Sequence, residues 1–361
     1  MNQSPDLSTE RRVVIVSRVK QNPYVALLCE GLRRPDLHIH PQISDTFSLT
    51  WMWRHRRQID ALHIHWLELL FVYPILRQSL KRWASVMAGL LVARLSGVRL
   101  VYTVHNIAQH EGRRARLVWL GHRVMFWLAQ AVHVHDYETA QTLAAQWGRR
   151  RGVHIIPHGN YMTAYRNDCS RAEARQRLEV DERAFVFLFL GRVRPYKGVE
   201  DLIAAFRTLP DADAILWVAG EIHEPGYERE LRALTSDDAR IHLDLRFVAD
   251  DELQVYLHAA DFCVLPYRHV TTSGAAILSF SFGTPIIAPR KGCFVALVGE
   301  GQQRGLLYDE TTLSGGSGNL TETLRRARSS DLAAMRTACV EYAQTLDWNR
   351  IARQHAAMYQ P

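Results

Sequence analysis

The hydrophobic positions of this chain follow two patterns that alternate along its length. Short apolar runs rich in Val, Ile and Leu are typical of strands that are buried on both faces. The segments between them carry apolar residues at helical spacing. A strand followed by a helix, repeated many times, predicts a parallel sheet covered by helices on both faces.

The pattern occurs as two series, one in each half of the chain. In the first half it predicts strands at 12–17, 59–65, 98–103, 131–135 and 153–156, and helices at 23–32, 74–95 and 116–129. In the second half it predicts strands at 184–190, 214–219, 241–243, 262–265 and 285–288, and helices at 199–208, 227–234, 251–259 and 273–282.

A length of 361 residues suits two domains better than one core. The pattern becomes loose and polar over 160–179, where we expect the linker. We therefore predict two doubly wound, Rossmann-like α/β domains, 1–165 and 166–340, followed by a C-terminal helical segment, 341–361, that packs back toward the first domain. Two such domains suggest a ligand held between their facing strand ends.

The composition is that of a soluble protein, with 47% hydrophobic and 22% charged residues. The five cysteines are scattered without a CxxC pair, which favours a reducing compartment and argues against a structural zinc site. The first ten residues lack the apolar core of a signal peptide, and no apolar run reaches the length of a membrane span. We expect a cytoplasmic protein.

The net charge is +7, and much of the positive charge lies in the first half. A basic face attracts polyanions or anionic lipid, but no nucleic-acid-binding module is recognisable, so we expect no nucleic-acid partner. The segment 74–95 carries basic residues and a Trp. It is expected either to bind an anionic membrane surface, on the inner face of the plasma membrane, or to pack on the sheet as an ordinary domain helix.

The most informative motif runs from 187 to 198. An apolar strand ends at Gly191, Arg192 and Lys197 follow, and Gly198 precedes a helix. A strand end, a Gly turn and a helix start form an anion pocket, and fixed cations there suit a diphosphate. The alternative is a solvated basic loop.

Weaker motifs follow in a characteristic order. They are Val218-Ala219-Gly220, Ala260-Asp261 with Leu265-Pro266, and Ser273-Gly274 with Gly283-Thr284-Pro285. Gly220 ends a strand at a tight turn that lets a ligand approach the backbone, and the helix start at Ser273 offers free N–H groups to a phosphate. With Arg192 and Lys197, this order resembles the nucleotide-sugar-binding domain of GT-B glycosyltransferases, in particular glycosyltransferase family 4.

The resemblance implies a set of donor-binding residues. Arg192 and Lys197 would hold the diphosphate, Phe247 and Val248 would lie against the nucleotide base, and Ser273 and Gly274 would meet the phosphates or the sugar. Gly220 and Tyr267, at the ends of two strands, complete the set. One departure matters: the family's two glutamates before the Gly-Thr-Pro turn are replaced by Val270 and Leu278, so the retaining site of the family is not carried over.

The first half carries polar residues at two strand ends. His63, His65 and Glu68 end one strand, and His105 ends the next, followed by Glu111. Together with Asn22-Pro23-Tyr24 and Ile156-Pro157-His158-Gly159, these pieces resemble bacterial exopolysaccharide glycosyltransferases of the xanthan-type β-mannosyltransferase family. That resemblance implies GDP-mannose as the donor and a lipid-linked oligosaccharide or other glycan as the acceptor.

The histidines have alternative interpretations. His63 and His65 share one face of a strand and could bind a metal, but no third ligand is evident. His133 and His135 are typical of satisfied polar groups in a core, and His105 suits either a ligand cleft or a structural turn.

Sugar transfer needs a base for the acceptor hydroxyl, and the candidates are Glu68, His105 and Glu111, with a carboxylate preferred. We expect no metal and no other cofactor, because the nucleotide sugar is a substrate and basic residues neutralise its diphosphate. The competing functions are a GT-B nucleotide-sugar epimerase and a non-catalytic protein that binds a sugar nucleotide.

Overall fold

A computed structural model describes residues 10–20, 22–105, 114–310 and 318–360 of the chain. The chain divides into two compact units. The first unit comprises residues 1–159 and 346–361, and the second comprises residues 160–345. The boundaries thus fall at 159/160 and 345/346, whereas the sequence suggested 165/166 and 340/341. The C-terminal segment is part of the first unit, where its helix packs on the first helix of the chain.

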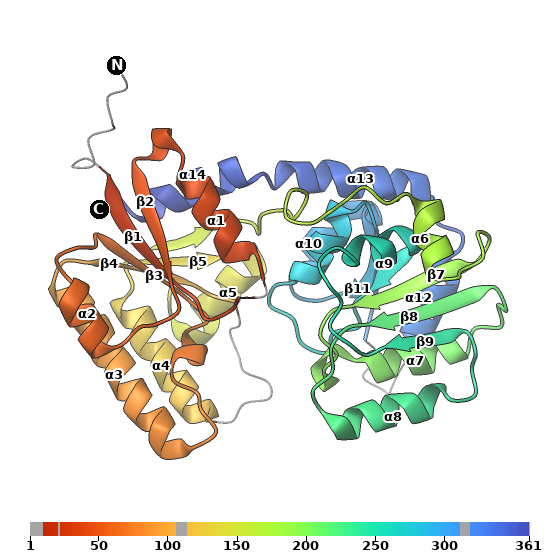
Figure 1. Cartoon of the computed structure of the whole chain (residues 1–361), viewed down its shortest axis with the longest axis horizontal. Helices are drawn as coiled ribbons and strands as arrows, with labels where there is room; N and C mark the ends of the chain where they lie inside the picture. The colour runs from red at the N-terminus through yellow and green to blue at the C-terminus, as the bar shows by residue number, and fades with distance from the viewer. Residues whose placement is uncertain (1–9, 21, 106–113, 311–317, 361) are drawn as a thin grey trace. The chain divides into compact units, whose positions relative to one another are not determined.

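The first unit is built on a six-stranded parallel sheet with the order β2-β1-β3-β4-β5-β6 (Figure 1). The strands are β1 Arg11–Val16, β2 Ile39–Ser44, β3 Ala61–His65, β4 Arg99–Thr103, β5 Ala131–Val134 and β6 Val153–Ile155. The helices are α1 Tyr24–Leu32, α2 Leu49–His55, α3 Leu76–Leu95, α4 Ala115–Leu128, α5 Tyr137–Trp147 and α14 Trp348–Met358, with short 3₁₀ turns η1 Pro35–Leu37 and η2 Leu67–Leu70.

The two faces of this sheet differ in chemistry because successive side chains of a strand point to opposite faces. Leu62 and Ile64 of β3 and Tyr102 of β4 pack in an apolar core with α2, α3 and α4. Their neighbours His63 of β3 and Thr103 of β4 point to the other face, where His63 hydrogen-bonds Tyr359 at the end of α14. One face is therefore a conventional hydrophobic core, and the other carries polar side chains near the carboxyl ends of β3 and β4.

The second unit repeats the architecture with the strand order β12-β11-β10-β7-β8-β9, again all parallel. The strands are β7 Phe185–Leu190, β8 Ala214–Ala219, β9 Ile241–Asp244, β10 Phe262–Val264, β11 Ile286–Pro289 and β12 Gly305–Tyr308. The helices are α6 Arg171–Arg177, α7 Val199–Arg207, α8 Pro225–Thr235, α9 Leu253–Ala259, α10 Gly274–Ser281, α11 Cys293–Val298, α12 Gly318–Ala327 and α13 Leu332–Thr345, with 3₁₀ turns η3 Pro195–Lys197 and η4 Glu300–Gln302.

The predicted strands and helices are all present, with ends that shift by one or two residues. Other elements were not predicted, among them β2, α5, α11 and β12. Strand β2 contains Pro41 and His40 at the edge of its sheet, so it lacks the uniform apolar pattern of the central strands. The linker was expected at 160–179. The boundary between the units lies at the start of this segment, and Ser170 and Glu173 form a capping box that begins α6 within it.

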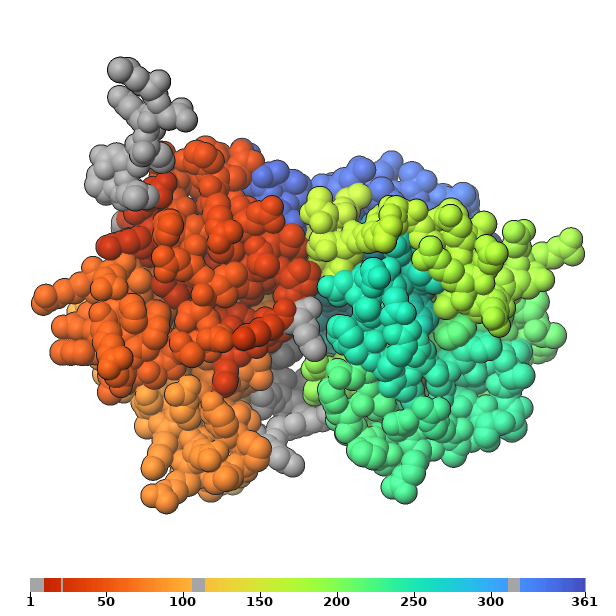
Figure 2. Space-filling view, in the orientation of Figure 1, coloured from red at the N-terminus to blue at the C-terminus, as the bar shows by residue number. Residues whose placement is uncertain are grey.

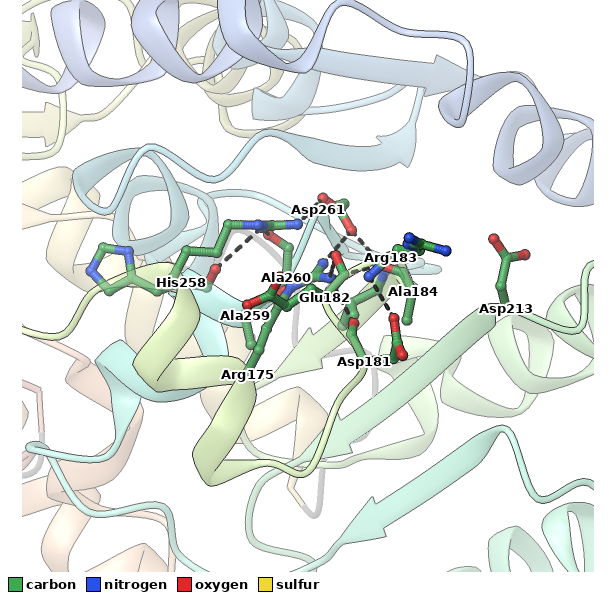
Figure 3. A network of polar contacts seen from close by, with 12 residues as sticks. Arg175, Asp181, Glu182, Arg183, Ala184, Asp213, His258, Ala259, Ala260 and Asp261 are labelled. Carbon is green, nitrogen blue, oxygen red and sulfur yellow. Dashed lines mark hydrogen bonds and ion pairs between the residues drawn. The ribbon is translucent and has the colours of Figure 1, made fainter.

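A buried ion network closes the amino-terminal end of the second sheet (Figure 3). The Arg175 guanidinium, 2% exposed, donates to the Asp261 carboxylate at 3.0 Å and to four backbone carbonyls. Asp261 also accepts from the backbone N–H of Val186 at 2.8 Å and from Arg171 at 2.6 Å. Because Asp261 precedes β10 and is fully paired, this part of the Ala260-Asp261 motif is structural and lies away from the strand ends that carry the candidate donor site.

Candidate active site

The predicted donor residues follow the carboxyl ends of four neighbouring strands in the second unit. Arg192 and Lys197 follow β7, Gly220 follows β8, Phe247 and Val248 follow β9, and Tyr267 follows β10. These strands lie side by side in the order β10-β7-β8-β9. The sheet topology therefore brings the loops to one edge, which is where open α/β sheets bind ligands.

Two glycines let these loops approach one another closely. Gly198 has a left-handed backbone (φ 65°), and a Cβ there would lie 2.3 Å from the carbonyl oxygen of Pro266. At Gly220 (φ 146°) a Cβ would lie 2.1 Å from the carbonyl oxygen of Gly191. Any side chain at either position would push the loops apart, so both positions require glycine for steric as well as conformational reasons.

Lys197 is the central cation of this edge. Its ammonium lies 5.1 Å from the centre of the Tyr267 ring and 5.8 Å from that of Phe189. No carboxylate or carbonyl oxygen of the described residues pairs with it. Burial, reinforced by the charges of Arg194 and Arg192, lowers the pKa of Lys197 to about 8. An ammonium held among aromatic rings and other cations is a site prepared for an anion.

Arg192 stands beside this lysine on the exposed side of the loop. Its guanidinium is 3.9 Å from the Glu221 carboxylate, which also lies 3.2 Å from the imidazole of His223. The contact between Arg192 and Glu221 is long and solvent-exposed, so it holds the guanidinium only weakly.

The start of α10 lies in the loop that follows β10. The Ser273 hydroxyl caps this helix by accepting from the backbone N–H of Ala276 at 3.2 Å. A helix start concentrates backbone N–H groups, which favours phosphate binding next to Gly274. Burial raises the pKa of Tyr267 well above its usual value, so its hydroxyl stays protonated at neutral pH.

The two residues expected near the base differ in exposure. The Phe247 side chain is 51% exposed, which leaves its ring available for stacking. Val248 is buried in an apolar cluster with Leu190 and Ala219, the last residues of β7 and β8. Val248 therefore supports the floor of the edge.

The positions of the missing glutamates are filled by packing contacts. Leu278 packs against the cluster around α9, and Val270 lies where a Cβ on Gly292 would approach it to 2.7 Å. Neither position supplies a carboxylate to a ligand. Retention through those two residues is excluded in this chain.

The first unit has histidines at the ends of its central strands. His65 ends β3, His105 follows β4, His135 follows β5 and His158 follows β6. His65 Nδ1 lies 2.9 Å from His105 Nε2, and the ring of Tyr24 lies within 5.8 Å, centre to centre, of all four imidazoles. We call these four imidazoles the histidine row.

One layer deeper, a hydrogen-bonded chain crosses the same strands. It runs from the Tyr359 hydroxyl to His63 (2.8 Å), from His63 to the Thr103 hydroxyl (2.7 Å), and from Thr103 to His133 (3.0 Å). It ends where His133 Nε2 donates to the carbonyl oxygen of Ile156 at 2.8 Å. Because that carbonyl only accepts, neutral His133 carries its proton on Nε2 and accepts at Nδ1 from the Thr103 hydroxyl. The Thr103 oxygen then accepts from His63 Nε2, and His63 Nδ1 accepts from the Tyr359 hydroxyl. Every group of this inner chain is satisfied.

Burial and mutual proximity keep these imidazoles neutral. Burial lowers the pKa of His65 to about 3 and those of His158 and His355 to about 4. Burial also holds the pKa of His105 well below its usual value, with a further contribution from neighbouring histidines. The row is thus a set of neutral donors and acceptors at pH 7.

His133 is a satisfied core residue, as predicted, but the same prediction is wrong for His135. Both ring nitrogens of His135 are buried and lack a hydrogen-bond partner among the described residues, and so does His65 Nε2. Such atoms are costly unless water or a ligand satisfies them. They mark the strand ends of the first unit as a polar binding surface.

The three candidate bases are not brought together. Glu68 is 6% exposed, and its carboxylate lies 3.8 Å from His122 of α4, in the layer of Tyr102, away from the histidine row. His105 is in the row, and Glu111 falls outside the described residues. For the metal hypothesis at His63 and His65, no group of three His, Cys, Asp or Glu in the described parts of the chain is arranged to hold an ion.

Trp66 was not singled out by the sequence, yet its conformation is unusual. Its backbone is left-handed (φ 47°, ψ 59°), which costs a non-glycine residue on the order of 1 to 3 kcal/mol. Its indole stacks on His105 with the ring centres 3.7 Å apart and the planes at 7°. The sequence does not indicate this conformation, because tryptophan has no preference for a positive φ. The only hint was the position of Trp66 between a predicted strand and the turn that follows it.

Comparison with known proteins finds glycosyltransferases. Residues 184–318 match the family described as glycosyl transferases group 1. The chain is 29% identical over 343 residues to a GDP-mannose:glycolipid 4-beta-D-mannosyltransferase of Xanthomonas campestris pv. campestris, covering 94% of this chain and 88% of the relative. It is 30% identical over 244 residues to a D-inositol 3-phosphate glycosyltransferase of Pseudarthrobacter chlorophenolicus, covering 63% and 57%.

Among solved structures, the fold is similar to that of Anabaena Alr3699/HepE in complex with UDP. The TM-score is 0.74 at 18% identity, and the alignment covers 96% of this chain and 98% of the other. At that identity the similarity concerns the fold. It agrees with the two parallel six-stranded sheets and with the fold class expected from the sequence.

Proposed function

We propose, from the premise that this chain is a GT-B glycosyltransferase using a nucleotide sugar, that its donor is GDP-mannose and its acceptor a lipid-linked glycan of exopolysaccharide synthesis. The observation that carries the donor site is Lys197, a cation without an anionic partner among the described residues, at the strand ends that match the group 1 family. GDP-mannose and a glycolipid acceptor are supported by the activity for which the Xanthomonas relative is named.

In this proposal the second unit stabilises the leaving diphosphate. Negative charge grows on the phosphate oxygens as the bond to the sugar breaks, and Lys197, Arg192 and the N–H groups at the start of α10 supply positive charge to them. These cations do the work that a divalent metal does elsewhere, so we expect transfer to proceed in EDTA.

The first unit is proposed to hold the acceptor at the histidine row. Neutral imidazoles and Tyr24 suit sugar hydroxyls, which both donate and accept hydrogen bonds. A carboxylate base remains the preferred proton acceptor, since the pKa of His105 is well below neutral. The variants Glu68→Gln and Glu111→Gln assign the base: the one that loses kcat while still binding donor identifies it.

The test is a thermal shift screen of nucleotide sugars followed by a transfer assay. GDP-mannose should raise the melting temperature more than UDP-glucose or ADP-glucose, because a ligand that binds only the folded state stabilises it. Transfer should require a lipid-linked acceptor. Turnover of GDP-mannose without acceptor would instead favour an epimerase, and binding without turnover a non-catalytic protein; either result contradicts the proposal.

A membrane surface is the proposed location of that acceptor. Helices α2, α3 and α4, which pack side by side, contain no Asp or Glu. We call them the three-helix surface, and Figure 2 shows α2 and α3, in orange, at the surface of the first unit. Its exposed side chains include the apolar Leu49, Trp53, Leu76, Leu80, Leu91, Leu95, Trp119, Leu120 and Trp127 and the basic Arg54, Arg77, Lys81, Arg94, Arg116 and Arg123.

This surface corrects one detail of the sequence prediction. The Trp of segment 74–95, Trp83, does not face outward; its indole nitrogen is buried and lies 3.3 Å from where a Cβ on Gly121 of α4 would sit. The exposed tryptophans belong to α2 and α4 instead. None of the helices in the described parts of the chain is long and apolar enough to span a bilayer.

Tryptophans and basic side chains without carboxylates fit an anionic lipid interface, at roughly 1 kcal/mol for each Arg or Lys near the surface. The protein should therefore float with vesicles of phosphatidylcholine and phosphatidylglycerol, and less with phosphatidylcholine alone. Replacing Trp53, Trp119 and Trp127 by Ala should reduce flotation, whereas Tyr137→Ala on α5, equally exposed, should not. Equal flotation of both variants would refute the three-helix surface.

A further inference from the structure

The imidazole of His105 is in contact with three neighbouring rings. Trp66 stacks flat on one face of its ring at 3.7 Å. His65 hydrogen-bonds Nε2 at 2.9 Å, and the Tyr24 ring meets it edge-on at 5.7 Å. An imidazole with a face, a nitrogen and an edge in contact has little freedom to rotate about its χ angles.

The hydrogen bond between His65 and His105 also fixes the proton positions. Only one of the two facing nitrogens can carry the hydrogen. If His105 donated, neutral His65 would carry its proton on Nε2, a buried atom without an acceptor among the described residues. A buried unpaired N–H costs more than an unpaired lone pair, so His65 Nδ1 donates and His105 accepts at Nε2. Neutral His105 then carries its proton on Nδ1 and is a donor there.

The backbone at Trp66 is what aims the indole. Its carbonyl oxygen accepts from the backbone N–H of Leu69 at 3.0 Å, so the chain turns from β3 into η2 at this residue. A glycine or an asparagine would adopt this left-handed turn at lower cost. A residue that is strained and stacked on a candidate site residue is better explained by that contact than by the turn alone.

The strand ends that carry the pair are themselves tied together. His63 and Thr103, each two residues before His65 and His105, are joined by the inner chain that reaches Tyr359 beyond α14. The inner chain fixes how β3 and β4 end side by side. The stack of Trp66 on His105 therefore rests on a rigid base.

We propose that Trp66 is a positioning residue, whose strained turn clamps His105 as an Nδ1–H donor toward the substrate of the transferase. The inference rests on the proposed function only for the identity of that substrate. The clamp itself is a property of the unliganded protein.

Three variants test it. Trp66→Gly removes the indole and relieves the backbone, so the protein should fold and GDP-mannose should raise its melting temperature as in the wild type. Its kcat should fall on the order of 10-fold to 100-fold, because misplaced groups lose rate more than binding. Trp66→Phe keeps an aromatic face and should retain most of kcat. His105→Gln serves as the reference for loss of the imidazole.

A second readout does not depend on activity. In ¹⁵N spectra of the histidine side chains, assigned with His105→Gln, wild-type His105 should show a protonated Nδ1 and an unprotonated Nε2. Trp66→Gly should shift these signals toward the mixture of forms seen for free imidazole. Unchanged signals together with unchanged kcat would overturn the clamp.

The outcomes separate the two claims. If His105→Gln lowers kcat and Trp66→Gly leaves both kcat and the spectrum unchanged, the clamp fails while the proposed function stands. If the wild type transfers no sugar from any nucleotide, the proposed function fails, and the nitrogen spectra alone decide the clamp.

Discussion

The two sheets of this chain each have six parallel strands, yet the side chains at their carboxyl ends differ in charge. The second unit ends in an ammonium, Lys197, that has no counter-charge in the described structure. The first unit ends in neutral imidazoles joined to one another and to aromatic rings. The topology decides where a ligand binds, and the side chains after each strand decide which one.

The difference suggests a division of labour. An unpaired cation is useful only for an anion, and the diphosphate of the donor is the anion of the reaction. Neutral imidazoles instead suit the uncharged hydroxyls of a glycan, because they donate and accept hydrogen bonds without carrying a charge. Arg175 differs from Lys197, because it is buried at the other end of the second sheet and paired with Asp261. A buried charge in this unit is expected to stabilise the fold only where an opposite charge pairs with it.

The largest predicted difference is between methionine substitutions of a cation that is paired, Arg175, and of one that has no anionic partner in the described structure, Lys197. Arg175→Met leaves Asp261 short of a partner and should lower the free energy of unfolding by about 3 to 5 kcal/mol. Lys197→Met removes a charge that burial disfavours, so the melting temperature should stay equal or rise. Its kcat/KM for the donor should nevertheless fall on the order of 10² to 10³-fold.

Calorimetry and a transfer assay on the two variants measure both effects. The distinction between matched and unmatched charge is lost if Lys197→Met destabilises the protein as Arg175→Met does.

Acid should lower the stability of the first unit more than that of the second. The pKa values of His65 and His355 are depressed to about 3 and 4 in the folded state, so the unfolded state binds more protons below pH 6.5. Stability is therefore present above that pH and is lost as the pH falls, on the order of 2 kcal/mol for each of these histidines at pH 5.

Hydrogen exchange followed peptide by peptide at pH 7 and pH 5 locates this loss. Strands β3 to β5 should lose protection more than β7 and β8. Equal loss in both sheets would show that the histidines do not distinguish the units.

The inner chain of the first unit can be cut at its middle. Thr103→Val keeps the shape and removes the hydroxyl that joins His63 to His133, leaving two buried nitrogens unpaired, which should cost about 1 to 3 kcal/mol. Thr284→Val in the second unit is the matched control, since Thr284 is equally buried and makes one hydrogen bond, to the carbonyl of Leu257. Denaturant unfolding of both should show the larger loss for Thr103, and the reverse order would contradict the chain.

The smallest predicted effect concerns donor binding in alkali. Because the pKa of Lys197 is about 8 without ligand, the protein must take up a proton to bind a diphosphate at higher pH. The dissociation constant for GDP should rise about tenfold per pH unit above 8, and it should be flat between pH 7 and 8. Titration calorimetry in two buffers would detect the proton taken up; a constant affinity up to pH 10 would speak against Lys197.

Much of the fold could be predicted from the sequence, because central parallel strands are buried on both faces and leave an unmistakable apolar pattern, as in Phe185–Leu190. Edge strand β2 was missed since only part of it is buried. The loops of the candidate donor site could be proposed from the sequence because glycine and basic residues follow the strand directly.

The remaining features depend on tertiary structure. The sequence places Glu200 and Asp201 close to Lys197. Only the structure shows that both carboxylates pair with Arg268, so that the ammonium has no anionic partner in the part of the chain that the structure describes. Likewise, His63 and Tyr359 are 296 residues apart, and no local pattern announces their contact. The left-handed backbone of Trp66 contradicts its intrinsic preference and is visible only once the fold is known.

The most direct test of the central claim observes the Lys197 ammonium itself. The chain has only four lysines, Lys20, Lys81, Lys197 and Lys291, so ¹³Cε-lysine spectra are simple, and Lys197→Arg assigns the signal. Without ligand the signal should titrate near pH 8, and saturating GDP should move its midpoint upward by a unit or more as the diphosphate stabilises the charged form. A midpoint that GDP leaves unchanged, with GDP bound, would contradict the account.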